Sequence, residues 1–192
     1  MHTRILKELI SGVANAILIL SVSVFVLSII AKSIGIYINT TPSLPLGFYK
    51  IIDEPIQKDA HVAFCPLRTE LLDDARARGY IGSGDCPGGY GLLLKRVMAM
   101  AGDTVLIDQA GIAVNGKNLP NSAQLRTDRH DRPLPQYHLD AVLNEAEYLL
   151  LSDLHPQSFD ARYFGLINRE QIHHVVRPVL TWSPNSKEPK HE

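Results

Sequence analysis

The sequence has 192 residues, of which 45% are hydrophobic and 20% are charged, so it can bury the core of one domain and is not a disordered chain. Its formal net charge is −1, and the lack of a basic surplus argues against direct binding of nucleic acid. The two cysteines have no second pair and no histidines at ligand spacing, so we expect no metal site. We also expect no cofactor.

The first element is an uncharged apolar run from Leu9 to Ala31. As a helix it would rise roughly 35 Å, enough to cross the ~30 Å hydrocarbon core of a bilayer. A cleaved signal peptide and a buried core helix are the alternatives, but a signal peptide has a shorter apolar region. Arg4 and Lys7 precede the run and Lys32 alone follows it, which favours a cytoplasmic N-terminus. We therefore expect three parts: a cytoplasmic stub and transmembrane anchor over 1–32, an extracytoplasmic domain over 33–182 and a polar tail over 183–192.

Beyond the anchor, the pattern predicts many short strands. Leu67–Arg78 is the exception, because early acids, late arginines and a following glycine are typical of a short helix. Glycines and prolines predict loops over Ile81–Gly91 and over residues 120–140, and Asn115-Gly116 indicates a type I′ hairpin. The predicted strands are Gly47–Ile52, Ala60–Cys65, Leu92–Met98, Thr104–Asp108, Ile112–Val114, Glu147–Ser152 and Ile172–Thr181. The fold class is therefore mainly β, behind one N-terminal transmembrane helix.

Cys65 and Cys86 flank the predicted helix and the glycine-rich loop, and each precedes a proline. Outside the cytoplasm, a disulfide is the natural interpretation. Closing a loop of about 20 residues would contribute around 3 kcal/mol to stability. Two unpaired thiols are the alternative.

Ser43 lies between Pro42 and Pro45, a short distance beyond the anchor. Proline fixes φ and lacks a backbone N–H, so the two prolines hold the serine in an extended, non-helical loop. Such a loop can present a hydroxyl group at a fixed place. A simple linker between anchor and domain is the alternative interpretation.

A serine hydroxyl is a weak nucleophile and needs a base, and the best candidate for that base is Lys95. The sequence has no Gly-x-Ser-x-Gly elbow and no obvious Ser-His-Asp pattern. On the predicted strand Lys95 shares a face with Leu93 and Val97, while Arg96 points the other way. Burial on an apolar face would lower the lysine pKa from ~10.4. The alternative is an amine that reaches solvent beside Arg96.

Three stretches in order resemble the successive sequence boxes of the type I signal peptidases. They are Pro42-Ser43-Leu44-Pro45, Lys95-Arg96-Val97 leading to Gly102-Asp103, and Ser158-Phe159-Asp160-Ala161-Arg162-Tyr163-Phe164-Gly165. These peptidases are membrane-anchored serine proteases with a Ser/Lys dyad, so the resemblance implies a signal-peptidase-like, β-rich catalytic domain. Within that family the chain is similar to the TraF peptidases of conjugative plasmid transfer, through Phe64-Cys65-Pro66 and Cys86-Pro87-Gly88-Gly89 before Leu93–Arg96.

The resemblance implies a role for each site residue. Ser43 would be the nucleophile and Lys95 the general base, with Ser158 orienting the lysine amine. Asp160 and Arg162 would form a supporting ion pair. The Ser43 backbone N–H would stabilise the oxyanion, and the Thr41 hydroxyl would be the second donor; a turn-stabilising hydroxyl is the alternative for Thr41.

The chain departs from the family pattern at four places. Leu44 stands where methionine is usual, Ala101 replaces a proline and Ala161 replaces a serine. Ser152-Asp153-Leu154 replaces the usual Gly-Asp-Asn, which puts in doubt a side-chain hydrogen bond that would tether this loop. None of these changes removes an atom of the dyad.

The resemblance implies a serine endopeptidase in the bacterial inner membrane, with a single pass and a periplasmic catalytic domain. Its leading substrate is a conjugative pilin precursor, which it would cleave or cyclise, and other partners would be the membrane and the conjugative transfer machinery. The alternatives are a general type I leader peptidase for secreted precursors and a non-catalytic envelope scaffold. A self-cleaving Ser/Lys repressor-like protein fits poorly, because an anchor precedes the serine and no DNA-binding segment does.

Overall fold

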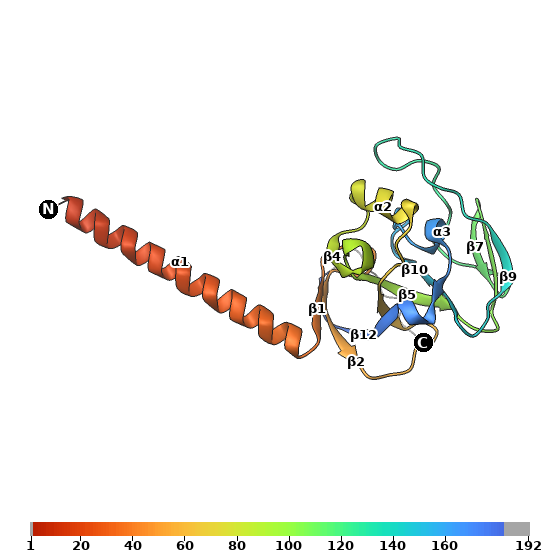
Figure 1. The fold of residues 1–192 in the computed structure, drawn as a ribbon, viewed down its shortest axis with the longest axis horizontal. Coiled ribbons are helices and arrows are strands. Elements are labelled where there is room, and N and C mark those ends of the chain that lie inside the picture. Colours follow the sequence, from red (N-terminus) through yellow and green to blue (C-terminus); the bar gives the residue numbers. More distant parts are fainter. Residues whose placement is uncertain (1, 183–192) are drawn as a thin grey trace. The chain divides into compact units, whose positions relative to one another are not determined.

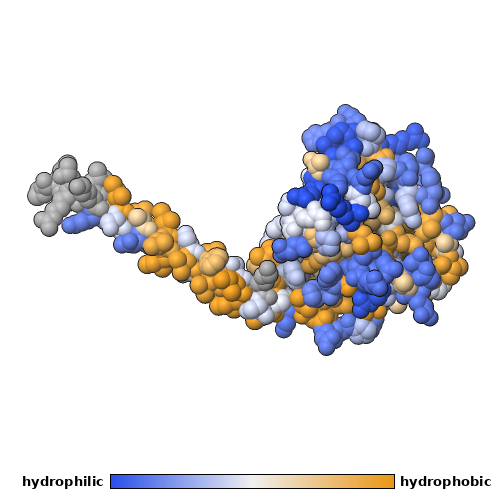
Figure 2. Space-filling model, viewed as in Figure 1, coloured by the Kyte–Doolittle hydropathy of each residue, from blue (hydrophilic) through white to orange (hydrophobic). Residues whose placement is uncertain are grey.

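The computed structural model describes residues 2–182, so the polar tail expected over 183–192 lies outside the described residues. The chain divides into two compact units between Tyr37 and Ile38. The first unit contains α1 (His2–Ser33), whose segment Ile10–Ala31 is long and apolar enough to cross a membrane, as its hydrophobic surface in Figure 2 illustrates. Serine hydroxyls in this segment bond back to the helix, for example from Ser21 to the carbonyl of Ile17, and so need no water. The helix fits a single-pass membrane anchor.

The second unit is β-rich, as predicted, and contains two antiparallel sheets (Figure 1). The larger sheet has the strand order β1-β2-β12-β3-β5-β10-β11, and the smaller has the order β8-β7-β6-β9. The larger sheet consists of β1 (Ile36–Asn39), β2 (Gly47–Ile52), β3 (His61–Phe64), β5 (Leu93–Ala99), β10 (Glu147–Leu151), β11 (Ile167–Asn168) and β12 (Ile172–Thr181). The smaller sheet consists of β6 (Thr104–Asp108), β7 (Gly111–Val114), β8 (Lys117–Asn118) and β9 (Leu139–Val142).

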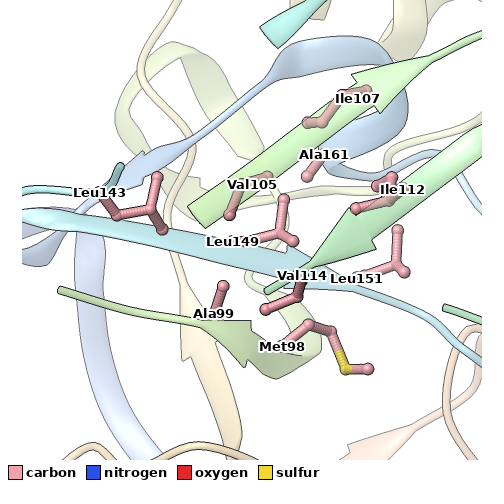
Figure 3. Packing of buried hydrophobic residues seen from close by; sticks show 10 residues of the cluster. All are labelled: Met98, Ala99, Val105, Ile107, Ile112, Val114, Leu143, Leu149, Leu151 and Ala161. Atoms are coloured by element: carbon pink, nitrogen blue, oxygen red, sulfur yellow. The ribbon is translucent and has the colours of Figure 1, made fainter. Parts of the chain in front are cut away.

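Both faces of β10 are buried, which is why this strand is a nearly continuous apolar run. Leu149 and Leu151 join side chains of β5, β6 and β7 in a cluster between the two sheets (Figure 3). Tyr148 and Leu150 belong to a second cluster with residues of β3, β5 and β12. Because side chains alternate along a strand, β10 contributes to one cluster on each of its faces. Its neighbour β5 also contributes to both clusters.

A third cluster forms around the short helix α2 (Glu70–Ala77). The Thr69 side chain caps the helix by accepting the N–H of Leu72, which explains why the helix is shorter than the predicted Leu67–Arg78. Cys65 and Cys86 form a disulfide in this cluster, with their Cα atoms 5.4 Å apart. The bond ties the end of β3 to the segment that leads into β5.

The remaining differences from the sequence analysis concern short elements. Residues Ile81–Gly91 were expected to be only a loop, but they contain β4 (Ser83–Cys86) and a 3-10 turn, η1 (Pro87–Gly89), because Ser83 and Cys86 each form a bridge with Tyr90. The expected loop before Gly165 contains α3 (Ala161–Phe164), and a second 3-10 turn, η2 (Arg169–Gln171), precedes β12. The sequence analysis also missed β1, β8, β9 and β11. The type I′ hairpin is confirmed, since Asn115 and Gly116 both have positive φ and join β7 to β8.

Candidate active site

Ser43 lies in a turn between β1 and β2, and Asn39 holds that turn. Asn39 is the last residue of β1 and is only 5% exposed. Its Nδ2 lies 3.0 Å from the carbonyl oxygens of Thr41 and Leu44 and 3.1 Å from that of Pro45. Its Oδ1 accepts the backbone N–H of Thr41. One buried amide therefore binds the backbone on both sides of Ser43 and fixes the conformation of the turn.

Lys95 lies in the middle of β5, opposite Val62 of β3, and is 3% exposed. Burial lowers its pKa to about 8, because the charged amine loses its hydration. Asp160 opposes this change and Arg162 adds to it. The alternative of a solvent-reaching amine does not hold, since Lys95 Nζ donates to Ser158 Oγ at 2.9 Å inside the protein.

Ser158 lies between Lys95 and Ser43. Its hydroxyl oxygen is 2.9 Å from Lys95 Nζ and 3.3 Å from Ser43 Oγ. Two hydroxyls and one amine thus form a hydrogen-bonded chain that starts in the turn, crosses the loop after β10 and ends on β5. Hydroxyl protons rotate, so the chain can carry its protons in either direction.

A buried ion pair supports the loop that carries Ser158. Asp160 and Arg162 are both fully buried, and the guanidinium binds the carboxylate through two bonds of 2.8 and 2.7 Å. Arg162 also donates to the backbone carbonyls of His155, Pro156 and Ser158. A buried ion is stable only when an opposite charge and further hydrogen bonds compensate for its lost hydration. The arginine thereby shapes the backbone on which the Ser158 hydroxyl is presented.

Ser152 supplies a tether between this loop and the Ser43 turn. Its hydroxyl donates to the backbone carbonyl of Ser43, and its N–H donates to Asp160 at 3.1 Å. The loop is also held by Asp153, whose carboxylate binds Arg96 at 2.7 Å. Bonds from Ser152 and Asp153, the two residues before Leu154, therefore hold the loop in place of the side-chain bond that Leu154 cannot make.

The Thr41 hydroxyl donates to Asn39 Oδ1 at 2.9 Å. Thr41 also borders the cavity beside Ser43, so its side chain is close to the place where a substrate would bind. To donate to an oxyanion, this hydroxyl would have to rotate away from Asn39. The structure therefore shows the turn-stabilising bond of Thr41, and oxyanion binding by this side chain stays a prediction.

A cavity of about 420 Å³ opens beside Ser43 and Ser158. Its other walls come from Arg78 to Tyr80, from Phe159 and Tyr163, and from the segment between β8 and β9. We call this segment, residues 120–138, the flap. Ser43 and Ser158 both line this cavity, whereas Lys95 does not.

The structure brings together five of the residues that the sequence analysis named: Ser43, Lys95, Ser158, Asp160 and Arg162. Thr41 borders the same cavity, and the cysteine pair lies elsewhere, beside α2. The sequence analysis gave no role to two further site residues, Asn39 and Ser152. An asparagine just before a proline-containing turn is a known turn signal and could have indicated the first of them. No local signal indicates the second, because its partner is 109 positions away.

Comparisons with known proteins identify the family. The family model described as "Signal peptidase, peptidase S26" matches residues 6–182, and the chain therefore belongs to the signal peptidase family S26. Among its relatives are two Escherichia coli proteins described as "Plasmid transfer protein TraF". The first is 45% identical over 94% of this chain and 99% of its own, and the second is 51% identical over 77% of this chain and 84% of its own. A solved signal peptidase I from Enterococcus faecalis V583 aligns with a TM-score of 0.36 and 20% identity, over 65% of this chain and 97% of that chain.

Proposed function

We propose that the chain is a membrane-anchored serine endopeptidase that processes a precursor protein for conjugative plasmid transfer, with Ser43 as nucleophile and Lys95 as general base. The observation that carries the proposal is the chain of hydrogen bonds from Ser43 through Ser158 to the buried Lys95 amine. Membership of the signal peptidase family supports the peptidase reaction, and the TraF relatives support the role in conjugation.

The reaction begins when Lys95 is neutral. In that state Ser43 donates its proton to Ser158 Oγ while Ser158 donates its own proton to Lys95 Nζ, so one proton crosses from the turn to β5. Ser43 Oγ then attacks the peptide carbonyl, and the oxyanion accepts the Ser43 N–H and the rotated Thr41 hydroxyl. Lys95 returns the proton to the leaving amine. The amide bond is broken, and the acyl group is left as an ester on Ser43.

A second nucleophile completes the reaction. Water, activated by the same lysine, releases a linear product. The free amino terminus of the substrate can attack instead, which releases a cyclic product without consuming water. Our leading substrate is the precursor of a conjugative pilin.

The position of Ser43 in the chain supports a substrate held at the membrane. Ser43 lies ten positions after Ser33, the end of α1, and an extended chain covers at most ~3.5 Å per residue. The nucleophile is therefore kept within roughly 35 Å of the anchor's end. With a cytoplasmic N-terminus, as the basic residues before the apolar run favour, the domain would lie in the periplasm.

The proposal is tested by the intact mass of the pilin subunit of the same conjugative system, taken from cells that carry wild-type protein or a variant. We expect the mature mass with wild type and the precursor mass with Ser43→Ala, Lys95→Ala and Lys95→Arg, because an arginine at position 95 remains charged and cannot act as a base. Ser83→Ala and Lys117→Arg alter exposed residues of the same types and should leave processing intact. A product one water lighter than the linear mature chain would identify cyclisation.

The same strains separate the alternatives. Accumulation of many unrelated secreted precursors with Ser43→Ala would indicate a general leader peptidase. Normal conjugation with both Ser43→Ala and Lys95→Ala would indicate a scaffold and would contradict the proposal.

A further inference from the structure

The cavity beside Ser43 has a wall of basic side chains. Arg78 comes from the end of α2, and Arg129 and Arg132 come from the flap. α2 and the flap both lie at the top of the domain in Figure 1, where Figure 2 shows mainly hydrophilic surface. Three arginines face a single carboxylate, that of Asp128, so the residues that line the cavity carry a positive surplus.

The Asp128 carboxylate is occupied by hydrogen bonds, most of them to groups of the flap. It accepts the Tyr80 hydroxyl, the Arg132 side chain and the backbone N–H groups of His130 and Arg132. Burial alone would raise its pKa, but these bonds outweigh burial and hold the pKa well below its usual range. Asp128 therefore stays ionised, fixes the flap and neutralises one arginine, Arg132.

Arg129 is the arginine of this wall whose charge is not neutralised. Its Nε donates to the neutral amide of Gln157 at 2.6 Å, and no ion pair involves it within residues 2–182. Arg78, by comparison, binds the carboxylate of Asp74 at 2.8 Å. The nearby His155 adds no charge, because burial and then Arg129, Arg162 and Lys95 lower its pKa. An unneutralised guanidinium thus borders the cavity that contains the Ser43 hydroxyl.

We propose that this cavity is a subsite for a carboxylate of the substrate, bound by Arg129 within a few residues of the cleaved bond. A guanidinium matches a carboxylate in shape and can bind it through two parallel hydrogen bonds. The carboxylate can belong to an aspartate or glutamate side chain or to the substrate's own C-terminus. The inference rests on the proposed peptidase function and names the chemical class of its substrate.

The test uses the full chain in detergent micelles and an equimolar mixture of synthetic 14-residue peptides whose cleavage products are identified by mass spectrometry. Each peptide is present with a free C-terminal carboxylate and with a C-terminal amide. For wild type we expect cleaved bonds to be enriched for an acid at one fixed position, by about tenfold, as charge-assisted hydrogen bonds allow. Enrichment for Asp and Glu in both forms identifies a side chain, whereas enrichment for the free acid over the amide identifies the C-terminus.

Arg129→Gln and Arg126→Gln form a matched pair of variants. Both arginines are exposed flap residues bonded to a glutamine, but Arg126 binds Gln109 and does not line the cavity. We expect the acid preference to disappear in Arg129→Gln and to persist in Arg126→Gln, with unchanged cleavage of peptides that lack the acid. Equal preferences in both variants, or no preference in wild type, would overturn the inference and leave the peptidase function standing.

Binding is measured separately, so that the test does not depend on turnover. The peptide mixture is passed over immobilised Ser43→Ala protein, and retained peptides are identified. We expect acidic peptides to be enriched on Ser43→Ala and on the double variant with Arg126→Gln, but not on the double variant with Arg129→Gln. If wild type cleaves none of these peptides and this pattern still holds, the carboxylate site stands, and the pilin mass measurement decides the peptidase function separately. If retention ignores charge, the site fails.

Discussion

Replacing Lys95 by methionine should abolish activity and, at neutral pH, make the protein more stable. Burial lowers the lysine pKa from 10.5 to about 8, and each pKa unit corresponds to about 1.4 kcal/mol. Below pH 8 the folded state therefore carries a penalty of about 3 kcal/mol for the charged amine. Methionine has a similar length and no charge. After subtracting roughly 1 kcal/mol for the lost bond to Ser158, we expect a net gain of about 2 kcal/mol at pH 7.

The stability gained by Lys95→Met should depend on pH. Because the pKa of Lys95 is lower in the folded state, the unfolded chain binds more protons between pH 8 and 10.5. The stability contributed by this group therefore rises with pH across that window, and the advantage of Lys95→Met should shrink by about 3 kcal/mol. Other titrating groups are common to both proteins and cancel in the difference.

The assay is equilibrium urea unfolding of the full chain in detergent micelles at pH 7 and at pH 10, for wild type and Lys95→Met. Lys117→Met, at an exposed position in β8, is the control and should show no pH-dependent difference from wild type. If Lys95→Met has no higher free energy of unfolding than wild type at pH 7, or if the difference is the same at both pH values, the lowered pKa of Lys95 is refuted.

Three further predictions concern the groups that support the site. Asn39→Ala should lower kcat by roughly tenfold to a hundredfold with little change in KM, because the turn that positions the nucleophile loses the hydrogen bonds of this buried side chain. Steady-state kinetics on the precursor measures both constants, and a change in KM alone would contradict the prediction. Arg162→Met should destabilise the protein by about 3–5 kcal/mol by leaving Asp160 charged and unpaired, whereas the double variant with Asp160→Asn should lose less than the sum of the single changes in urea unfolding. Reducing the Cys65–Cys86 bond, which closes a loop of 21 residues, should lower stability by about 3 kcal/mol; an unchanged unfolding midpoint with dithiothreitol would show that the bond contributes nothing.

The larger strands and the anchor could be predicted from the sequence because they depend on local patterns. Alternation on β5 placed Lys95 and Arg96 on opposite faces, and the structure buries the first while the second pairs with acids at the surface. The elements that were missed are short, so local patterns indicate them poorly, and some depend on partners far along the chain, as β9 depends on β6. β4 forms through bridges to Tyr90, and α3 begins at the Asp160 cap beside the buried Arg162.

The candidate site could be predicted only in part for the same reason. Ser43 and Lys95 stand out by their flanking residues, and the resemblance to a family adds Ser158, Asp160 and Arg162. The contact from Ser152 to the carbonyl of Ser43 joins residues far apart in the chain and has no local signal. The basic wall of the cavity is likewise assembled from α2 and the flap, so its charge surplus exists only in the folded protein.

If Ser43 is the nucleophile, it carries the acyl group during turnover, and mass spectrometry of the enzyme can locate that group. The full chain in micelles is mixed with the pilin precursor above pH 8, where Lys95 is neutral, quenched in acid within one turnover, and mapped by peptide digestion. We expect an acyl adduct on the peptide containing Ser43 in wild type, and none in Ser43→Ala or Lys95→Met. An adduct on another residue, or full processing of the precursor by Ser43→Ala, would contradict it.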